Sequence, residues 1–170
     1  MPALQLPPEV GAVLRGYFTC EITTVNRQGQ PITWPSLPYY DEEAGRIILT
    51  VSIAFPVKAQ NARRHPQVSL LYSDPTGTAL EHPPAVLVQG DAAVAEVLEL
   101  DTPQMRALFQ TAARRQPDSR QFYGNRVARR LFAWYLFQRI ALTVTPRRIL
   151  VWPGRDFAAA PTEIELGHVE

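Results

Sequence analysis

The chain has 170 residues with a formal net charge of +1, and 19% of the residues are charged. The length suits a single domain with a sizeable hydrophobic core, which we expect to span residues 1–170. The near-neutral charge excludes a global field that would draw the protein to nucleic acid or to an acidic membrane, so any anion must be held by a local cluster of donors.

The cysteine and histidine content excludes two further kinds of protein. The single cysteine, Cys20, allows no intramolecular disulfide, and its strand-like surroundings predict a small buried side chain rather than a nucleophile. The three histidines are too far apart in the sequence to suggest a metal site. No apolar run approaches the ~20 residues that cross a bilayer, and the N-terminal residues lack the pattern of a signal peptide. We therefore expect a cytoplasmic protein without a metal.

The first fifty residues predict a helix followed by short strands. The expected elements are a helix over residues 7–16, a strand over 16–26, an extended segment over 31–41 and a strand over 46–52. Pro7 and Pro8 suit the first turn of the helix, and Gly29 marks the tip of a turn. Because prolines interrupt the extended segment, it cannot be a fully paired central strand; it is an edge, a bulge or the lining of a pocket.

The remaining residues predict further strands and three helices. The expected elements are a helix over residues 57–65, strands over 67–74 and 85–99, helices over 101–116 and 125–138, and strands over 139–146 and 147–154. Gly90 lies in the middle of the longest strand and suggests a bulge or kink, and Pro146 separates the last two strands. Sequential strands with hairpin-length turns predict an antiparallel sheet, and six or seven of them favour a closed or nearly closed barrel.

Three sequence blocks follow one another in the first half of the chain. They are a glycine turn with two prolines and an aromatic pair (GQPITWPSLPYYD, 29–41), a strand that ends in small hydroxyl residues (RIILTVS, 46–52), and a basic segment before a proline and an apolar strand (KAQNARRHPQVSLLY, 58–72). In this order they resemble the FMN-binding split-barrel family, which includes pyridoxamine 5'-phosphate oxidase. The resemblance implies a mainly β protein of the α+β class, a six-stranded antiparallel split β-barrel with flanking helices. It also implies a homodimer that holds flavin mononucleotide (FMN) in a groove between subunits.

The resemblance also implies a set of cofactor-binding residues, and elementary chemistry agrees with several of them. A flavin phosphate is a dianion that needs cationic or amide donors, and Lys58 begins a helix whose free amides add to its charge. Strand alternation places Thr50 and Ser52 on one face. Residues 33–36 are expected along the flavin ring, and Trp152 is expected at the flavin of the partner subunit. The full expected set is Thr33, Trp34, Pro35, Ser36, Thr50, Val51, Ser52, Lys58, Asn61, Gln89 and Trp152.

One departure from the family pattern concerns the phosphate. Relatives often carry an arginine or a serine beside the lysine, whereas this chain has Pro56 and Val57 there, in an apolar loop. The departure implies weaker phosphate binding, a different cofactor, or a greater dependence on backbone amides. On a helix, Lys58, Arg63 and Arg64 are also open to a plainer interpretation as solvated surface charges.

The resulting hypothesis is an FMN-dependent oxidoreductase that passes hydride between flavin and a nicotinamide or another small organic substrate. No side chain stands out as a catalytic acid or base, and pyridoxamine phosphate is not the expected substrate. A second hypothesis is a reductase that uses the deazaflavin F-420, with Arg27, Arg63 and Arg64 along its longer anionic tail. A third is a non-catalytic flavin- or heme-binding carrier or sensor, with His65 or His168 as the heme ligand.

Overall fold

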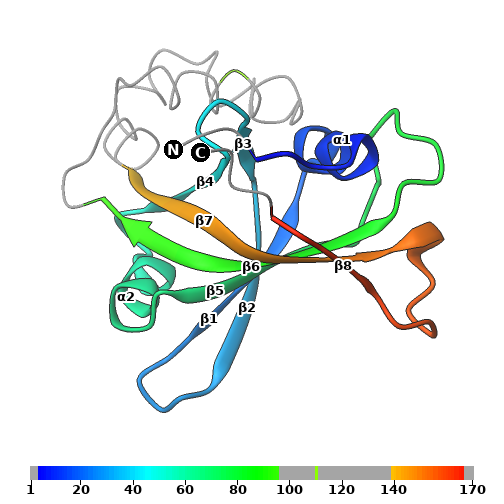
Figure 1. Cartoon of the computed structure of the whole chain (residues 1–170). Coiled ribbons are helices and arrows are strands. Elements are labelled where there is room, and N and C mark those ends of the chain that lie inside the picture. The colour runs from blue at the N-terminus through cyan, green and yellow to red at the C-terminus, as the bar shows by residue number, and fades with distance from the viewer. Residues whose placement is uncertain (1–3, 96–109, 111–138, 167–170) are drawn as a thin grey trace.

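One antiparallel sheet, curled into a half-barrel, organises the protein (Figure 1). The computed structural model describes residues 4–95, 110 and 139–166. Within them the strand order is β2-β1-β5-β6-β7-β4-β3, and β8 pairs with β7. The strands are β1 (Cys20–Val25), β2 (Pro31–Ser36), β3 (Tyr39–Asp41), β4 (Arg46–Ser52), β5 (Gln67–Tyr72), β6 (Ala85–Val94), β7 (Arg139–Trp152) and β8 (Thr162–Ile164).

Two α-helices flank this sheet in the described part of the chain. Helix α1 (Pro8–Gly16) packs against β3 and β6, and helix α2 (Val57–Arg64) packs against β1 and β6. A short 3-10 turn, η1 (Pro153–Arg155), follows β7. Both helices lie where the sequence predicts them, whereas the helices expected over residues 101–116 and 125–138 fall outside the described residues, apart from residue 110. None of the helices described here is long and apolar enough to span a membrane.

The prolines of the extended segment explain its structure. Residues 31–41 divide into β2 and the short strand β3, and β2 is an edge strand that pairs only with β1. Pro31 and Pro35 are exposed alternate residues of β2, so the backbone groups of this edge offer few donors to another strand. The prediction of an edge or a broken strand is therefore confirmed, and the eight described strands exceed the expected six because β3 and β8 are short additions.

The expected division at Pro146 is wrong. Residues 139–152 form one continuous strand of 14 residues, β7. Its partner β4 pairs with it only up to Val144, and its partner β8 pairs with it from Ile149 onward. Pro146 lies between these two partners, where its missing N–H removes no ladder hydrogen bond on that side.

Gly90 produces the kink that the sequence predicts. The register between β6 and β7 shifts between Gln89 and Gly90, which is a β-bulge opposite Pro146. A Cβ atom at Gly90 would stand 2.3 Å from the carbonyl oxygen of Thr145, so no other residue fits without moving the backbone. The close approach of β6 and β7 at this point lets the sheet curl into the half-barrel.

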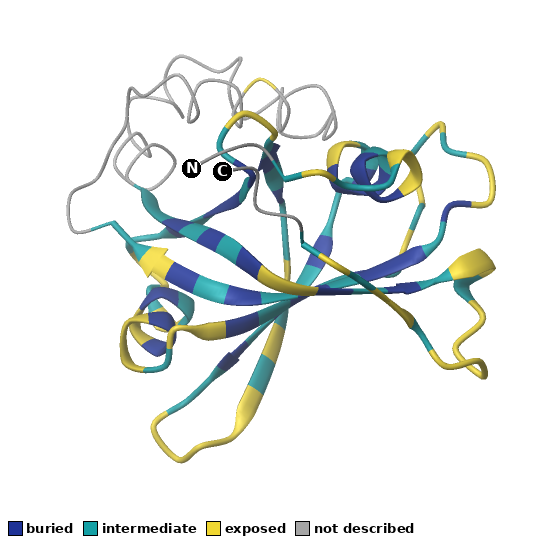
Figure 2. Cartoon of the chain, in the orientation of Figure 1, coloured by how far each residue is buried: buried dark blue, intermediate teal, exposed yellow. Residues whose placement is uncertain are grey.

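Alternation along the strands places the hydrophobic core inside the half-barrel (Figure 2). On β4, for example, Leu49 and Val51 are buried, whereas Thr50 and Ser52 on the opposite face are half-buried. The helices contribute Val13, Leu14 and Ala59 to the same core. Its largest fully buried side chains include Tyr17, Tyr72, Leu14, Ile22, Ile47, Leu49, Leu70, Leu142 and Ile149.

Candidate functional site

Lys58 lies at the start of α2 and points toward the end of β2. Its ammonium group donates a hydrogen bond of 2.8 Å to the hydroxyl of Ser36, and the Lys58 side chain is half-buried. The helix begins after Pro56 without a side-chain cap, so the free backbone amides of its first turn are close to the same position. Ser36 pairs with Cys20 in the β1–β2 ladder at the edge of the sheet. The Ser36 hydroxyl, the Lys58 ammonium and the free amides of the helix thus form a group of hydrogen-bond donors there.

Burial changes the pKa of Lys58. It lowers the pKa of Lys58 from its ordinary value of 10.5, and the nearby positive charge of Arg139 lowers it further. A bound anion would oppose both effects, because it restores favourable interactions to the charged ammonium. The same burial raises the pKa of the Cys20 thiol to about 12, which keeps this neighbouring group neutral and inert.

Arg139 joins the site from a distant part of the chain. It is the first residue of β7 and lies directly opposite Ser52, the last residue of β4. Its Nε atom is buried and has no hydrogen-bond partner in the described part of the protein. Arg139 is not among the residues that the sequence predicts. In the sequence it is only a basic residue at the start of a strand, and its pairing with Ser52 cannot be deduced from that position.

The hydroxyl-bearing strand β4 has the geometry that alternation predicts. Thr50 and Ser52 share one face, and Val51 is buried on the opposite face. Ser52 ends the strand just before the loop that leads to Lys58, and its hydroxyl accepts a hydrogen bond from the amide of Ala54 at 3.3 Å. Ser52 therefore faces Arg139, whereas the predicted contact of Val51 with a cofactor would have to be made by its backbone.

Asn61 has a structural position one turn after Lys58. Its side chain is buried, its amide donates to the hydroxyl of Thr24 at 3.1 Å, and its carbonyl oxygen accepts from Arg64 at 2.7 Å. Both polar atoms of the amide are thus engaged within the protein. Asn61 joins α2 to β1, and it would reach a phosphate or ribityl group only by exchanging these bonds.

The residues of β2 divide between the two faces of the sheet. Trp34 is partly buried and packs against the core beside Ile22, its neighbour in the ladder. Thr33 and Pro35 are exposed on the other face, where the hydroxyls of Thr33 and Thr23 lie 2.8 Å apart. Of the four expected residues on β2, only Ser36 is in contact with Lys58 in the structure.

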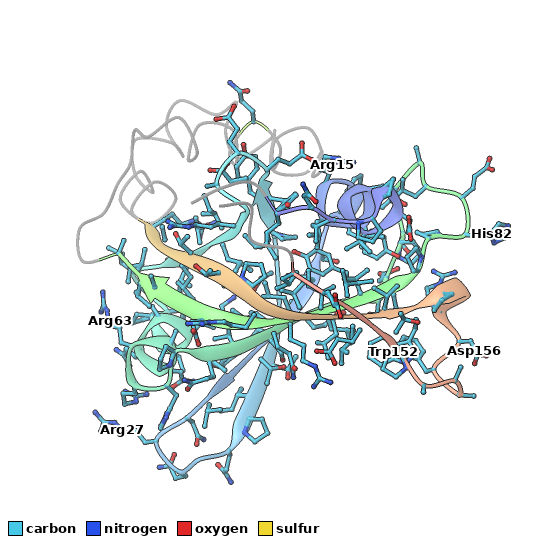
Figure 3. The ribbon with its side chains drawn as sticks, in the orientation of Figure 1. Arg15, Arg27, Arg63, His82, Trp152 and Asp156 are labelled. Carbon is cyan, nitrogen blue, oxygen red and sulfur yellow. The ribbon has the colours of Figure 1, made fainter. Side chains whose placement is uncertain are left out.

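The other two predicted contacts, Gln89 and Trp152, lie on β6 and at the end of β7. Gln89 pairs with Arg148 in the β6–β7 ladder, and Trp152 at the far end of β7 packs at a tilted angle against Phe157, with ring centres 5.6 Å apart. Figure 3 shows Trp152 on the opposite side of the molecule from Arg63 of α2. A strand of this length extends over roughly 40 Å, so a cofactor that touches both Lys58 and Trp152 would have to take Trp152 from a second copy.

Four of these residues form two linked pairs. Lys58 donates to Ser36, Arg139 lies opposite Ser52, and the charge of Arg139 is near enough to lower the pKa of Lys58. None of the ion pairs seen in the described residues includes Lys58 or Arg139. Such a donor set fits a phosphate group, because ammonium, guanidinium and hydroxyl groups all donate to phosphate oxygens. We refer to these four residues as the anion site.

Comparison with solved structures identifies the fold as a split barrel. The conserved hypothetical protein Rv2991 from Mycobacterium tuberculosis matches with a TM-score of 0.60 and 19% identity, over 98% of this chain and 94% of that one. A protein related to general stress protein 26, of the pyridoxinephosphate oxidase family, from Clostridium acetobutylicum matches with a TM-score of 0.57 and 8% identity, over 92% of both chains. The heme storage protein HutZ from Vibrio cholerae matches with a TM-score of 0.56 and 17% identity, over 87% of this chain and 95% of that one.

These similarities confirm the fold that the three sequence blocks predict. The chain has the split-barrel fold of the pyridoxamine 5'-phosphate oxidase-like proteins. No protein-family model matches the sequence, and no curated protein matches it. Because identities are below 20% in the three structures described, the comparison establishes the fold alone, and the cofactor must be argued from the residues of the anion site.

Proposed function

We propose that the protein binds FMN and acts as a flavin-dependent oxidoreductase on a small organic substrate. The observation that carries this proposal is the anion site, in which Lys58 and Arg139 flank the hydroxyls of Ser36 and Ser52. A flavin phosphate carries a charge near −2 at neutral pH, which two cations can balance. The fold supports the proposal, because one similar structure belongs to the pyridoxinephosphate oxidase family.

The protein's own residues would bind and orient the cofactor. The anion site would hold the phosphate, and the face of β4 that carries Thr50 and Ser52 would direct the rest of the molecule along the sheet. Residues 33–36 and Gln89 would contact the ring and ribityl regions, with Trp152 contributed by the partner subunit of a homodimer. When bound, the flavin itself supplies the hydride chemistry, whereas the protein excludes water and selects the substrate.

Titration with FMN and riboflavin tests this proposal, because the two ligands differ only by the phosphate. We expect Lys58→Ala to weaken FMN binding about 10- to 100-fold, as expected for the loss of a charged hydrogen bond, and to leave riboflavin binding unchanged. Flavin fluorescence quenching or calorimetry measures both constants. Arg63→Ala is the control, since Arg63 is an exposed cation on the same helix that donates only to the carbonyl of Ala95 in the described structure. Equal losses for FMN and riboflavin would exclude a phosphate-binding role for Lys58.

A heme-binding carrier is the second candidate function, and the similarity to the heme storage protein HutZ favours it. His65 follows α2 as its C-terminal cap and is half-buried, while His168 lies outside the described residues. The absorption spectrum of the protein after incubation with each cofactor separates the candidates, because flavin absorbs near ~450 nm, deazaflavin near ~420 nm and heme shows a Soret band. A Soret band that His65→Ala abolishes, without flavin binding, would replace the flavin proposal by the heme-binding one.

The deazaflavin F-420 remains a third possible outcome of the same spectrum. Its longer anionic tail would need the basic track of Arg27, Arg63 and Arg64. In the structure Arg63 already donates to the carbonyl of Ala95, and Arg64 donates to Asn61. Arg27 lies in the β1–β2 hairpin (Figure 3). A tail that bound all three arginines would therefore have to displace the hydrogen bonds that Arg63 and Arg64 now make.

A further inference from the structure

Arg139 and Ser52 occupy opposed positions at the end of two neighbouring strands. In the β4–β7 ladder the pair Ser52–Arg139 follows the pairs Thr50–Ala141 and Val51–Ile140. Directly opposed residues of antiparallel strands have their Cβ atoms about 4.5–5.5 Å apart on one face. The guanidinium of Arg139 therefore begins beside the hydroxyl of Ser52, and its charge reaches the ammonium of Lys58.

The buried part of Arg139 lacks the partner that such a group normally has. Its Nε atom is shielded from solvent and makes no hydrogen bond within residues 4–95, 110 and 139–166. Three other arginines in these segments form ion pairs with carboxylates: Arg15 with Glu42, Arg147 with Asp91 and Arg148 with Glu163. Leaving a buried donor of a charged group unsatisfied is costly, and placing it near a second cation adds repulsion. An anion between Lys58 and Arg139 would relieve both costs.

The loop before α2 contains no cation that could help Lys58 to balance a phosphate dianion. Residues 53–57 read IAFPV, so Lys58 is the first cation after β4. One lysine balances a single negative charge, whereas a phosphate monoester carries about −1.5 to −2 near pH 7. A second cation would have to come from outside this loop, and the register of β7 places Arg139 opposite Ser52, the last residue before the loop.

We propose that Arg139 is the second cation of the anion site and that it makes the site selective for phosphate monoesters over phosphodiesters. This inference rests on the proposed function, because FMN is a monoester, whereas F-420 carries a phosphodiester and FAD carries a pyrophosphate that is esterified at both ends. The planar guanidinium can bond two oxygens of a terminal phosphate at once. A phosphodiester, like each phosphorus of the FAD pyrophosphate, has only two free oxygens and one negative charge, so it gains less from the second cation at this site.

The test compares the binding of FMN, FAD and riboflavin to the wild type, Arg139→Gln and Arg139→Lys. We expect Arg139→Gln to weaken FMN binding by about tenfold or more and FAD binding by much less, so that the preference for FMN over FAD falls. Riboflavin binding stays unchanged, and Arg139→Lys recovers part of the loss. Arg27→Gln is the charge-matched control, since Arg27 is exposed in the β1–β2 hairpin. Thermal unfolding of each variant establishes that it is folded.

Four other outcomes decide between the inference and the proposed function. Unchanged FMN binding in Arg139→Gln, together with a loss in Lys58→Ala, would overturn the role of Arg139 and keep the flavin function. Equal losses for FMN and FAD would overturn its selectivity, and equal losses for FMN and riboflavin would assign Arg139 a structural role only. If the wild type binds no flavin, thermal shifts with glycerol phosphate and dimethyl phosphate test Arg139 alone. Stabilisation by the monoester that Arg139→Gln removes would support it, and identical shifts would overturn it.

Discussion

The half-buried charge of Lys58 has an electrostatic cost that a bound anion would offset. Its ammonium donates a hydrogen bond to the neutral hydroxyl of Ser36, and it lies near the cation Arg139. The lowered pKa of Lys58 means that the folded protein binds this proton less tightly than the unfolded chain does. The anion site is thus less favourable when empty than when an anion is bound.

Lys58→Met tests this electrostatic cost in phosphate-free buffer. Below the folded-state pKa, Lys58 is protonated in both states and its burial penalty is fully present; the penalty disappears as the pH rises toward the unfolded value of 10.5. We therefore expect the variant to be more stable than the wild type at pH 7, by about 0.5–1 kcal/mol after allowance for solvent screening, and this difference to shrink by pH 10. Urea denaturation across this pH range measures the difference in the free energy of unfolding.

Arg27→Met is the control, because Arg27 is exposed and its stability difference should not change with pH in this way. A stability difference for Lys58→Met that does not depend on pH would contradict the explanation.

Helix α2 is positioned by a small buried network rather than by its own sequence preference. It has eight residues, no side-chain cap and basic residues in its last turn. Such a short helix is marginal on its own in water, so its place depends on tertiary contacts. Ala59 and Ala62 pack into the core, and Asn61 bonds Thr24 of β1 and Arg64. The start of the helix, and with it Lys58, is held in place by these contacts.

Asn61→Ala should therefore affect both stability and ligand binding. Loss of the Asn61 amide leaves the buried hydroxyl of Thr24 without its donor. We expect the free energy of unfolding to fall by about 1–3 kcal/mol. FMN affinity should also fall, because Lys58 loses its fixed position. Chemical denaturation and FMN titration measure the two effects, with exposed Gln60→Ala on the same helix as the control. Wild-type stability in Asn61→Ala would show that the network does not hold α2.

At the scale of the whole molecule, the half-barrel separates the expected cofactor contacts. The anion site lies where β4 ends and β7 begins, whereas Trp152 lies at the other end of β7. Because β7 has 14 residues between these positions, we expect a single flavin to contact both only across two chains. A homodimer in which each subunit completes the other's groove remains the expectation, and it predicts an assembly of two chains.

Size-exclusion chromatography with light scattering tests the dimer. We expect a particle of twice the 19.1 kDa chain mass. Trp152→Ala should weaken the binding of FMN and riboflavin alike, by about 0.5–1.5 kcal/mol for a lost aromatic contact, without changing the preference for phosphate. Trp34→Ala and Phe157→Ala are not suitable controls, because Trp34 packs against the core and Phe157 packs against Trp152. Asp156→Asn is the control, because Asp156 is exposed in the same turn and its side chain accepts from the amide of Ala158. A monomer that binds FMN with full affinity would exclude a shared groove.

Local features of the chain were predictable because they depend on neighbours in the sequence. Pro8 at the start of α1, the turn at Gly29, the bulge at Gly90 and the shared face of Thr50 and Ser52 all follow from backbone preferences or from strand alternation. The predicted break at Pro146 is wrong because it also rests on a local backbone preference. Proline usually interrupts a strand, and only the arrangement of β4 and β8 shows that one side of β7 has no partner there.

By itself the sequence determined the positions of most described strands, both described helices and the fold class, and it singled out Lys58 as a candidate phosphate ligand. Only the tertiary structure decided that Arg139 lies opposite Ser52, that the amide of Asn61 is engaged by Thr24 and Arg64, and that Trp152 is remote from Lys58. The physical reason is that backbone preferences act between adjacent residues. A cross-strand contact depends instead on the register between segments more than eighty residues apart, which packing of the whole sheet establishes.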